Sequence, residues 1–416
     1  MKRKVVVFAG LMALTLSVYA DIAVSNAKVF SGVPWQEVIV GYTITGSSGG
    51  PVGLRTIVSD NDAGIAWTNV TYDAAALTEG EHQFRWNDAK VNSTNCEVRV
   101  QAFMPMYCIV DLSSGSKSSN YPVSYLEEIP NGGWTDEYKT TKLPLRLIEA
   151  GTFIMGEDQS DETHRVSLSK PYYMGVFEVS QKQYKLVMDS NPSSRTPYLY
   201  DSYDLEKYYC NGDRSVVKYS ERTFNNGKIG DTYPVWLVTH EMLRGDSVGT
   251  QWPSSSDVDA SSFMGKLRAR TGIGFDLPTE AQWEYACRAG TSTIYSYGNA
   301  ANGNYMWYES NSSVSVHEIG TRRPNPWGLY DMHGNVVECC LDWKGSLEYG
   351  MDPLGALSGT SRIVRGGSYS YPGVEYCTSF SRWDMFPRYD FDGGCTMTFV
   401  HAYVGFRLCI PIVMAR

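Results

Sequence analysis

The chain has 416 residues, which is too long for one average domain, so we expect two. With 43% hydrophobic and 19% charged residues, it has the composition of a globular protein and not of a disordered one. Its formal net charge of −9 makes it a poor candidate for binding nucleic acid. The 29 tyrosines are typical of carbohydrate- or protein-binding surfaces, and equally of strands, in which tyrosine packs well.

Residues 1–20 have the pattern of a secretory signal peptide. Basic residues at 2–4 precede an apolar stretch at 5–18, and a small-x-small cleavage site follows at 18–20. The alternative is a membrane anchor, for which the apolar stretch is short. We therefore expect a mature chain that begins at Asp21, is secreted, periplasmic or on the cell surface, and has no membrane span. Loss of three positive charges and no negative ones changes the net charge to −9 − 3 = −12.

The residues from 21 to 112 are predicted to form a small all-β domain. Segments 38–44 and 96–102 alternate between two faces, as strands do, and turn-rich sequences lie between the predicted strands. Such a pattern of short strands indicates an immunoglobulin-like or fibronectin-like sandwich. Asp60, Asn61 and Asp62 could hold calcium, although a solvated turn is the simpler interpretation.

The residues from 113 to 142 are predicted to be a linker, because 113–120 are almost all serine, glycine and other polar residues. Three short helices are predicted after it. Two begin with a hydroxyl residue followed three positions later by glutamine, the signature of a capping box. The predicted helices follow Ser180 and stop at Asn191-Pro192, follow Thr279 and stop at Gly290, and span 261–270 before Gly272.

Six segments in the C-terminal two-thirds of the chain form an ordered series. They are Ala-Gly-Thr-Phe-Ile-Met-Gly at 150–156, Tyr-Tyr-Met-Gly-Val-Phe-Glu-Val-Ser at 172–180, Leu-Pro-Thr-Glu-Ala-Gln-Trp-Glu-Tyr-Ala at 277–286, Trp-Gly-Leu-Tyr-Asp-Met-His-Gly-Asn-Val-Val-Glu at 327–338, Arg-Gly-Gly-Ser at 365–368 and Gly-Phe-Arg-Leu at 405–408. In order and spacing they resemble the formylglycine-generating enzyme (sulfatase-modifying factor) family. The resemblance implies an α+β, C-type-lectin-like domain over residues 143–412, with few regular elements and long ordered loops.

Two glutamates of this region, Glu280 and Glu284, lie four positions apart on a predicted helix. They could act as an acid–base pair. Their place in the first turn, without a metal motif, favours a role as helix-dipole or salt-bridge partners. The adjacent Cys339 and Cys340 look like a metal or redox pair, but neighbours on a strand point to opposite faces, so we expect no shared metal.

The cysteine pair that performs the family's chemistry is missing from the expected place. In the family's enzymes, two cysteines just after the Gly-Gly-Ser segment bind copper(I), a metal that soft sulfur ligands suit. Here residues 369–376 contain no cysteine, so we expect neither copper nor oxidase activity. Cys377 follows, and the resemblance implies that it forms a disulfide with Cys287.

The resemblance also implies a structural calcium ion. Asp331, Gly334, Val336 and Glu338 match the family's calcium site, which has two side-chain and two backbone oxygen ligands. Hard oxygen ligands in a tight turn suit this cation.

These observations predict a secreted ligand-binding or structural module whose partner is a protein or a glycan. The segment from 369 to 404 is rich in aromatic and charged residues, as binding surfaces are. Alternatively, these aromatic residues simply fill the core. The competing function is that of a sulfatase-maturing or other oxidoreductase acting on a protein cysteine. The candidate ligand-surface residues are Tyr371, Tyr376, Trp383, Asp384, Arg388 and Tyr389.

Overall fold

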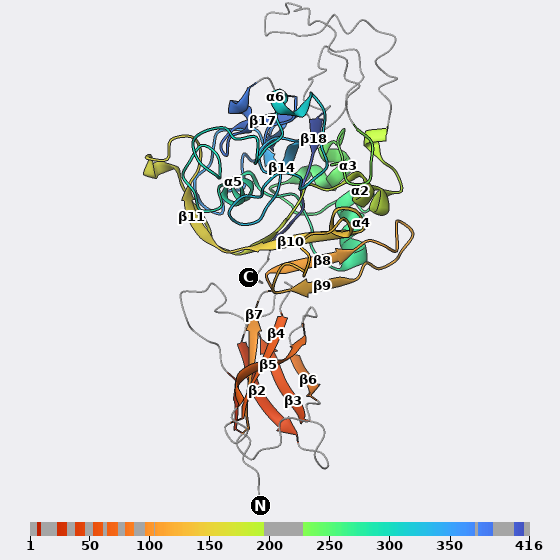
Figure 1. Cartoon of the computed structure of the whole chain (residues 1–416), viewed down its shortest axis with the longest axis vertical. Helices are drawn as coiled ribbons and strands as arrows, with labels where there is room; N and C mark the ends of the chain where they lie inside the picture. The colour runs from red at the N-terminus through yellow and green to blue at the C-terminus, as the bar shows by residue number, and fades with distance from the viewer. Residues whose placement is uncertain are drawn as a thin grey trace, which may run out of the picture. The chain divides into compact units, whose positions relative to one another are not determined.

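The computed structural model describes residues 105–194, 228–370, 373–385 and 403–411, together with the backbone of seven strands between residues 6 and 103 (Figure 1). The chain divides into two compact units. The smaller unit runs to Cys108 and includes Ser124–Ile129, and the larger consists of Ile109–Val123 and Pro130–Pro411. Within the described residues, no helix has the length and apolar character needed to cross a membrane.

The smaller unit has two sheets, ordered β1-β7-β4-β5 and β2-β3-β6. The predicted strands at 38–44 and 96–102 are confirmed as β3 and β7. Strand β1 pairs in parallel with β7 and falls inside the predicted signal peptide, whose removal stays a prediction. Two sheets suit the predicted sandwich, while its immunoglobulin-like character stays a prediction. The strands are β1 (Val6–Ala9), β2 (Ala23–Phe30), β3 (Val38–Thr45), β4 (Gly53–Asp60), β5 (Ile65–Asp73), β6 (Gly80–Trp86) and β7 (Cys96–Phe103).

The larger unit is α+β, and Figure 1 shows that long loops join its short strands and helices. One sheet contains β19, β13, β10 and β8 as hydrogen-bonded neighbours; the others run β11-β12-β15 and β17-β16-β14-β18. The strands from residue 107 onward, of which β9 falls mostly in the smaller unit, are β8 (Tyr107–Asp111), β9 (Val123–Leu126), β10 (Lys142–Ile148), β11 (Gly151–Ile154), β12 (Arg165–Leu168), β13 (Tyr172–Gly175), β14 (Val337–Trp343), β15 (Gly350–Met351), β16 (Arg362–Arg365), β17 (Arg382–Met385), β18 (Val404–Gly405) and β19 (Cys409–Pro411).

Two of the three predicted helices begin where the sequence predicts, and the third, predicted over 261–270, spans Phe263–Thr271. Ser180 and Thr279 each form a complete capping box with the glutamine three residues later. Their ends fall earlier than expected, because Asp189 and Ala289 adopt the left-handed conformation that closes a helix. The described helices are α1 (Glu137–Thr140), α2 (Gln181–Met188), α3 (His240–Arg244), α4 (Phe263–Thr271), α5 (Glu280–Arg288) and α6 (Glu309–Ser312), with 3-10 turns η1 (Glu162–His164), η2 (Pro192–Ser194), η3 (Val248–Gln251) and η4 (Val374–Cys377).

The segment that the sequence predicts to be a flexible connector is partly built into the larger unit. The Arg270 guanidinium on α4 donates hydrogen bonds to the Tyr121 hydroxyl at 2.7 Å and to the Ser116 carbonyl at 2.5 Å. The Tyr121 amide in turn donates to the Arg270 carbonyl at 2.9 Å, and Tyr121 is buried. The sequence predicted a linker here because residues 113–120 are polar. It could not show that Arg270, about 150 positions away, holds part of this segment in place.

The core of the larger unit forms around α5. Trp283 is fully buried and packs with Met174 of β13, Cys340 of β14 and Ile363 of β16. Replacing a buried tryptophan of this kind by alanine typically costs about 3–5 kcal/mol of stability. The helix therefore connects two sheets and brings the segments at 277–286 and 327–338 together.

Candidate functional site

The two glutamates of α5 belong to a buried ion network and are not an acid–base pair. Arg382 donates to both oxygens of Glu280, at 2.7 and 2.8 Å. Glu284 is fully buried, accepts from Arg288 at 2.9 Å and from the Gly156 amide at 2.8 Å, and pairs with Arg365. Both carboxylates are thus neutralised by arginines, so the salt-bridge interpretation is confirmed.

The predicted calcium residues lie on a tight turn that leads into β14. Three of its residues adopt the left-handed conformation: Asp331 at φ 55°, Gly334 at φ 81° and Asn335 at φ 60°. At Gly334 only glycine fits, because an added Cβ would lie 2.0 Å from the Trp307 carbonyl oxygen. The turn buries the side chains of Asp331 and Glu338.

The two predicted calcium-binding carboxylates have different surroundings. Asp331 Oδ2 accepts the Gly320 amide at 2.6 Å, whereas its buried Oδ1 has no hydrogen-bond partner. Burial raises the pKa of Asp331 to about 6. Both oxygens of Glu338 are held by Arg407, each at 2.5 Å, and Glu338 Oε2 also accepts the Trp283 indole N–H at 2.7 Å.

Asp331 is better placed than Glu338 to bind calcium, because one of its oxygens has no hydrogen-bond partner whereas both oxygens of Glu338 have one. The unpartnered buried Oδ1 of Asp331 is a hard oxygen of the kind that calcium takes. Glu338 Oε1 accepts a hydrogen bond from Arg407, and a carboxylate oxygen has a second lone pair. Among the described residues, no three His, Cys, Asp or Glu side chains are arranged around a common metal position. A cation here would therefore also need backbone carbonyls, as predicted for Gly334 and Val336.

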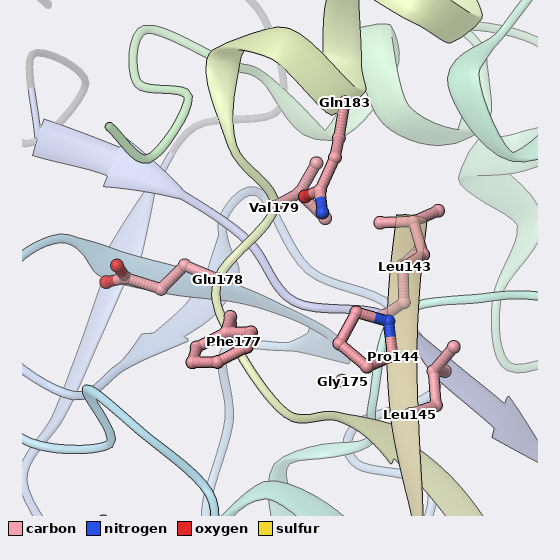
Figure 2. A pocket seen from close by; sticks show the side chains of 9 residues that line it. Leu143, Pro144, Leu145, Gly175, Phe177, Glu178, Val179 and Gln183 are labelled. Atoms are coloured by element: carbon pink, nitrogen blue, oxygen red, sulfur yellow. The ribbon is translucent and has the colours of Figure 1, made fainter. Parts of the chain in front are cut away.

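Glu178 is a third buried carboxylate in this region, and no pattern in the sequence predicts a role for it. It follows β13 and accepts the Val336 amide at 3.1 Å and the Asn335 side-chain amide at 2.7 Å. Burial, with the nearby charges of Asp331 and Glu338, raises its pKa well above the usual range. Figure 2 shows its carboxylate directed away from Leu143 and Pro144, which line a cavity of about 10 Å³, room for one water molecule.

The predicted disulfide cysteines meet around one histidine. His333 Nδ1 lies 2.7 Å from the Cys377 carbonyl oxygen, so this nitrogen carries the proton in the neutral ring. Its Nε2 accepts from the Ser296 amide at 3.2 Å and lies 3.7 Å from Cys287 Sγ. Both cysteines are buried free thiols in this structure, and burial raises the pKa of each to about 12. The structure thus brings both segments to His333, and the disulfide stays a prediction.

The adjacent cysteines of β14 point into different surroundings, as predicted. Cys339 Sγ lies 3.3 Å from Met385 Sδ, whereas Cys340 packs in the core cluster with Trp283. Both are buried thiols.

Half of the candidate ligand-surface residues can be placed. Tyr376 on η4 and Trp383 on β17 are partly exposed, with ring centroids 5.0 Å apart. Asp384, next on β17, pairs with Lys344. Tyr371, Arg388 and Tyr389 lie outside the described residues.

Known proteins resemble mainly the larger unit. The sequence model of the sulfatase-modifying factor enzyme 1-like domain matches residues 136–412, about two-thirds of the chain. Formylglycine-generating enzyme of Bos taurus is 28% identical over 293 residues, which cover 61% of this chain and 71% of that protein. The corresponding mouse enzyme is 30% identical, over 53% of this chain and 65% of that protein.

Two further similarities concern proteins with other names. Serine/threonine-protein kinase pkn1 of Chlamydia caviae is 28% identical over 54% of this chain, and the match spans only 32% of the kinase. The solved structure of Treponema denticola variable protein 1 aligns with a TM-score of 0.45 and 24% identity, covering 65% of this chain and 95% of that chain. The family match, the ordered segments and the α+β architecture agree, and the chain belongs to the sulfatase-modifying factor enzyme 1-like (formylglycine-generating enzyme) family.

Proposed function

We propose that this chain is a ligand-binding or structural module at the cell exterior that does not perform the family's copper chemistry. The stretch after Gly366-Gly367-Ser368, at 369–376, contains no cysteine. The next cysteine, Cys377, is buried, and its raised pKa keeps it a neutral thiol at pH 7. A single protonated thiol is a poor copper(I) ligand, since the thiolate is the form that binds metal.

The observation that carries the binding role is the aromatic pair of Tyr376 and Trp383. Both rings are partly exposed, and Trp383 lies on β17, a strand at the edge of its sheet. Aromatic side chains with a polar end are typical anchors of binding surfaces. The ion pair between Lys344 and Asp384 adds charged groups of both signs beside them. The proposed partner is a protein or a glycan.

The test is binding of the full chain to protein and glycan arrays. Trp383→Ala is expected to lose at least tenfold in affinity for any ligand found, as a hot-spot aromatic does. Trp252→Phe, a change at an aromatic residue outside 369–404, is the matched control and should bind as the wild type does. Equal binding by both variants would remove this surface from the proposal.

A structural calcium ion is part of the proposal and rests on the unpartnered Asp331 oxygen. Asp331, Glu338 and the carbonyls of Gly334 and Val336 would hold it. A ligand that binds only the folded state stabilises by about 2.7 kcal/mol at a hundredfold excess over Kd. Calcium should therefore raise the Tm of the wild type, while Asp331→Asn should lose that increase. No change of Tm on chelation in the wild type would exclude the ion.

The competing function is oxidation of a protein cysteine, which the family resemblance implies; two of the relatives are named formylglycine-generating enzymes. It is favoured by the retained Arg365-Gly366-Gly367-Ser368 segment, which lies directly against Cys377. An added Cβ at Gly367 would be 2.6 Å from Cys377 Sγ. A thiol at this place could take part in chemistry only if it became exposed and ionised.

Export from the cytoplasm is also proposed, from the charge and apolar pattern of residues 1–20. Intact-mass measurement of protein recovered from the periplasm or the medium should give a chain that begins at Asp21. A membrane-bound form that retains Met1 would support the anchor instead.

A further inference from the structure

Glu178 contacts the predicted calcium turn from a distant part of the chain. Its Oε1 accepts the backbone amide of Val336 and its Oε2 accepts the side-chain amide of Asn335, although 158 and 157 positions separate these residues from it. Glu178 is 1% exposed, so neither hydrogen bond competes with bulk water.

The turn has a left-handed residue, Asn335, between its two predicted carbonyl ligands. Asn335 adopts φ 60°, a conformation that asparagine tolerates when its side chain can hydrogen-bond locally. Asn335 is fully buried, and its backbone is held by the Trp307 carbonyl at 2.9 Å and the Tyr369 amide at 2.8 Å. Its side-chain oxygen accepts the His317 amide at 3.0 Å. Glu178 accepts a hydrogen bond from its side-chain amide at 2.7 Å.

We propose that Glu178 is a positioning residue for the cation site: it fixes the turn at 334–336, so that the carbonyl oxygens of Gly334 and Val336 face a divalent cation bound at Asp331. This inference rests on the proposed calcium ion. The hydrogen bonds of Glu178 go to residues of the turn itself, so the role proposed for it is to hold the turn in place. Residues that orient metal ligands in this way typically contribute 10- to 100-fold to metal affinity.

The surrounding charges favour a cation at this place. Glu178, Asp331 and Glu338 are all buried on this turn or against it, so three carboxyl groups share one region of the interior. Arg407 is ion-paired with Glu338, and Arg322 also acts on Asp331. A cation beside Asp331 would lower the repulsion among the three carboxylates, so that cation and positioning residue support each other.

The test is calcium titration of the chelator-treated full chain by calorimetry. Glu178→Gln keeps the volume and one acceptor for the Val336 amide, and it should raise the Kd for calcium by about 10- to 100-fold. Glu162→Gln, at an exposed glutamate that pairs with Arg165, is the matched control and should leave the Kd unchanged. A merely structural role would lower the Tm equally with and without calcium and leave the Kd within about twofold.

A second variant covers the case in which Glu178→Gln does not fold. Asn335→Gly removes the side-chain amide that Glu178 binds, while glycine keeps the left-handed backbone without strain. It should also raise the Kd for calcium. If the wild type binds calcium and both variants keep its Kd within about twofold, the positioning role of Glu178 is wrong and the calcium site stands. If the wild type binds no calcium, the calcium site and the positioning role are both wrong.

Discussion

Glu338 and Arg407 form a two-point ion pair in the interior of the larger unit, with side chains that are both 0% exposed. The arginine also donates to the Gly175 carbonyl at 3.0 Å, which connects β14 to the end of β13. The pair thereby joins two of the segments that carry the family resemblance, at 327–338 and 405–408. This contact stabilises the fold of the larger unit, whichever surface of the chain binds a ligand.

Arg407→Met should therefore be strongly destabilising. Removing one partner leaves Glu338 as an uncompensated buried charge, which typically costs about 3–5 kcal/mol. Arg165→Met is the control, because Arg165 and Glu162 pair on the surface with side chains 54% and 68% exposed, and such pairs contribute about 0–1 kcal/mol. Urea unfolding of both variants measures the difference. Similar losses in the two would show that the buried pair contributes little.

Gly367→Ala should destabilise more than Gly272→Ala, although both glycines have nearly the same backbone angle, φ 73° and φ 71°. At Gly272 nothing lies within 4 Å of an added Cβ, so only the left-handed backbone costs free energy, about 1–2 kcal/mol. At Gly367 the Cβ would meet Cys377 Sγ and the Tyr376 carbonyl at 2.6 Å, which adds about 1–3 kcal/mol of overpacking. If thermal unfolding shows the same loss of stability in both variants, η4, which carries Tyr376 and Cys377, can move to make room for the added Cβ at no cost in free energy.

The stability of the larger unit should fall in mild acid because of His333. Burial lowers the pKa of His333 to about 4 in the folded chain, against about 6.5 when unfolded. Between these values the unfolded state binds more protons, so the free energy of unfolding decreases as pH falls from 6.5 toward 4. The part of the free energy of unfolding that depends on neutral His333 is fully present above pH 6.5. It amounts to at most about 3 kcal/mol, and it is lost as the pH falls toward 4.

Urea unfolding at pH 7, 6 and 5 tests this pH dependence, with His333→Gln as the comparison. The variant lacks the titrating ring, so its stability should depend less steeply on pH in this window. Parallel curves for variant and wild type would assign the acid sensitivity to other groups.

The predicted Cys287–Cys377 disulfide can be tested by peptide mapping without reductant. The two segments meet at His333, and closing a loop of ninety residues would stabilise by about 4–5 kcal/mol in the chain-entropy model. The expected result is one linked peptide pair from the exported chain, and Cys287→Ala should then free Cys377 for alkylation after unfolding. Recovery of both cysteines as alkylated thiols from the unfolded wild type would contradict the bridge.

The local parts of this fold could be predicted from the sequence, and the contacts between distant parts could not. Ser180 and Thr279 each act on the residue three positions ahead, so their capping boxes are visible in the sequence. Glu178 and Asn335 both fall in segments that the resemblance picked out, yet nothing in a single sequence shows that residues 157 positions apart are bonded. The early end of α2 at Met188 depends on the left-handed Asp189, a residue type that tolerates this conformation without requiring it.

Oxygen consumption decides whether the domain binds a ligand without oxidising it. The full chain is incubated with copper(I), a reductant and a Cys-x-Pro-x-Arg peptide, and Cys377→Ala is run beside it. A binding domain without oxidase activity should give no oxygen uptake above the variant's rate and leave the peptide unmodified by mass spectrometry. Uptake that requires Cys377, with conversion of the peptide cysteine to formylglycine, would contradict the binding role and show that the chain is an oxidase.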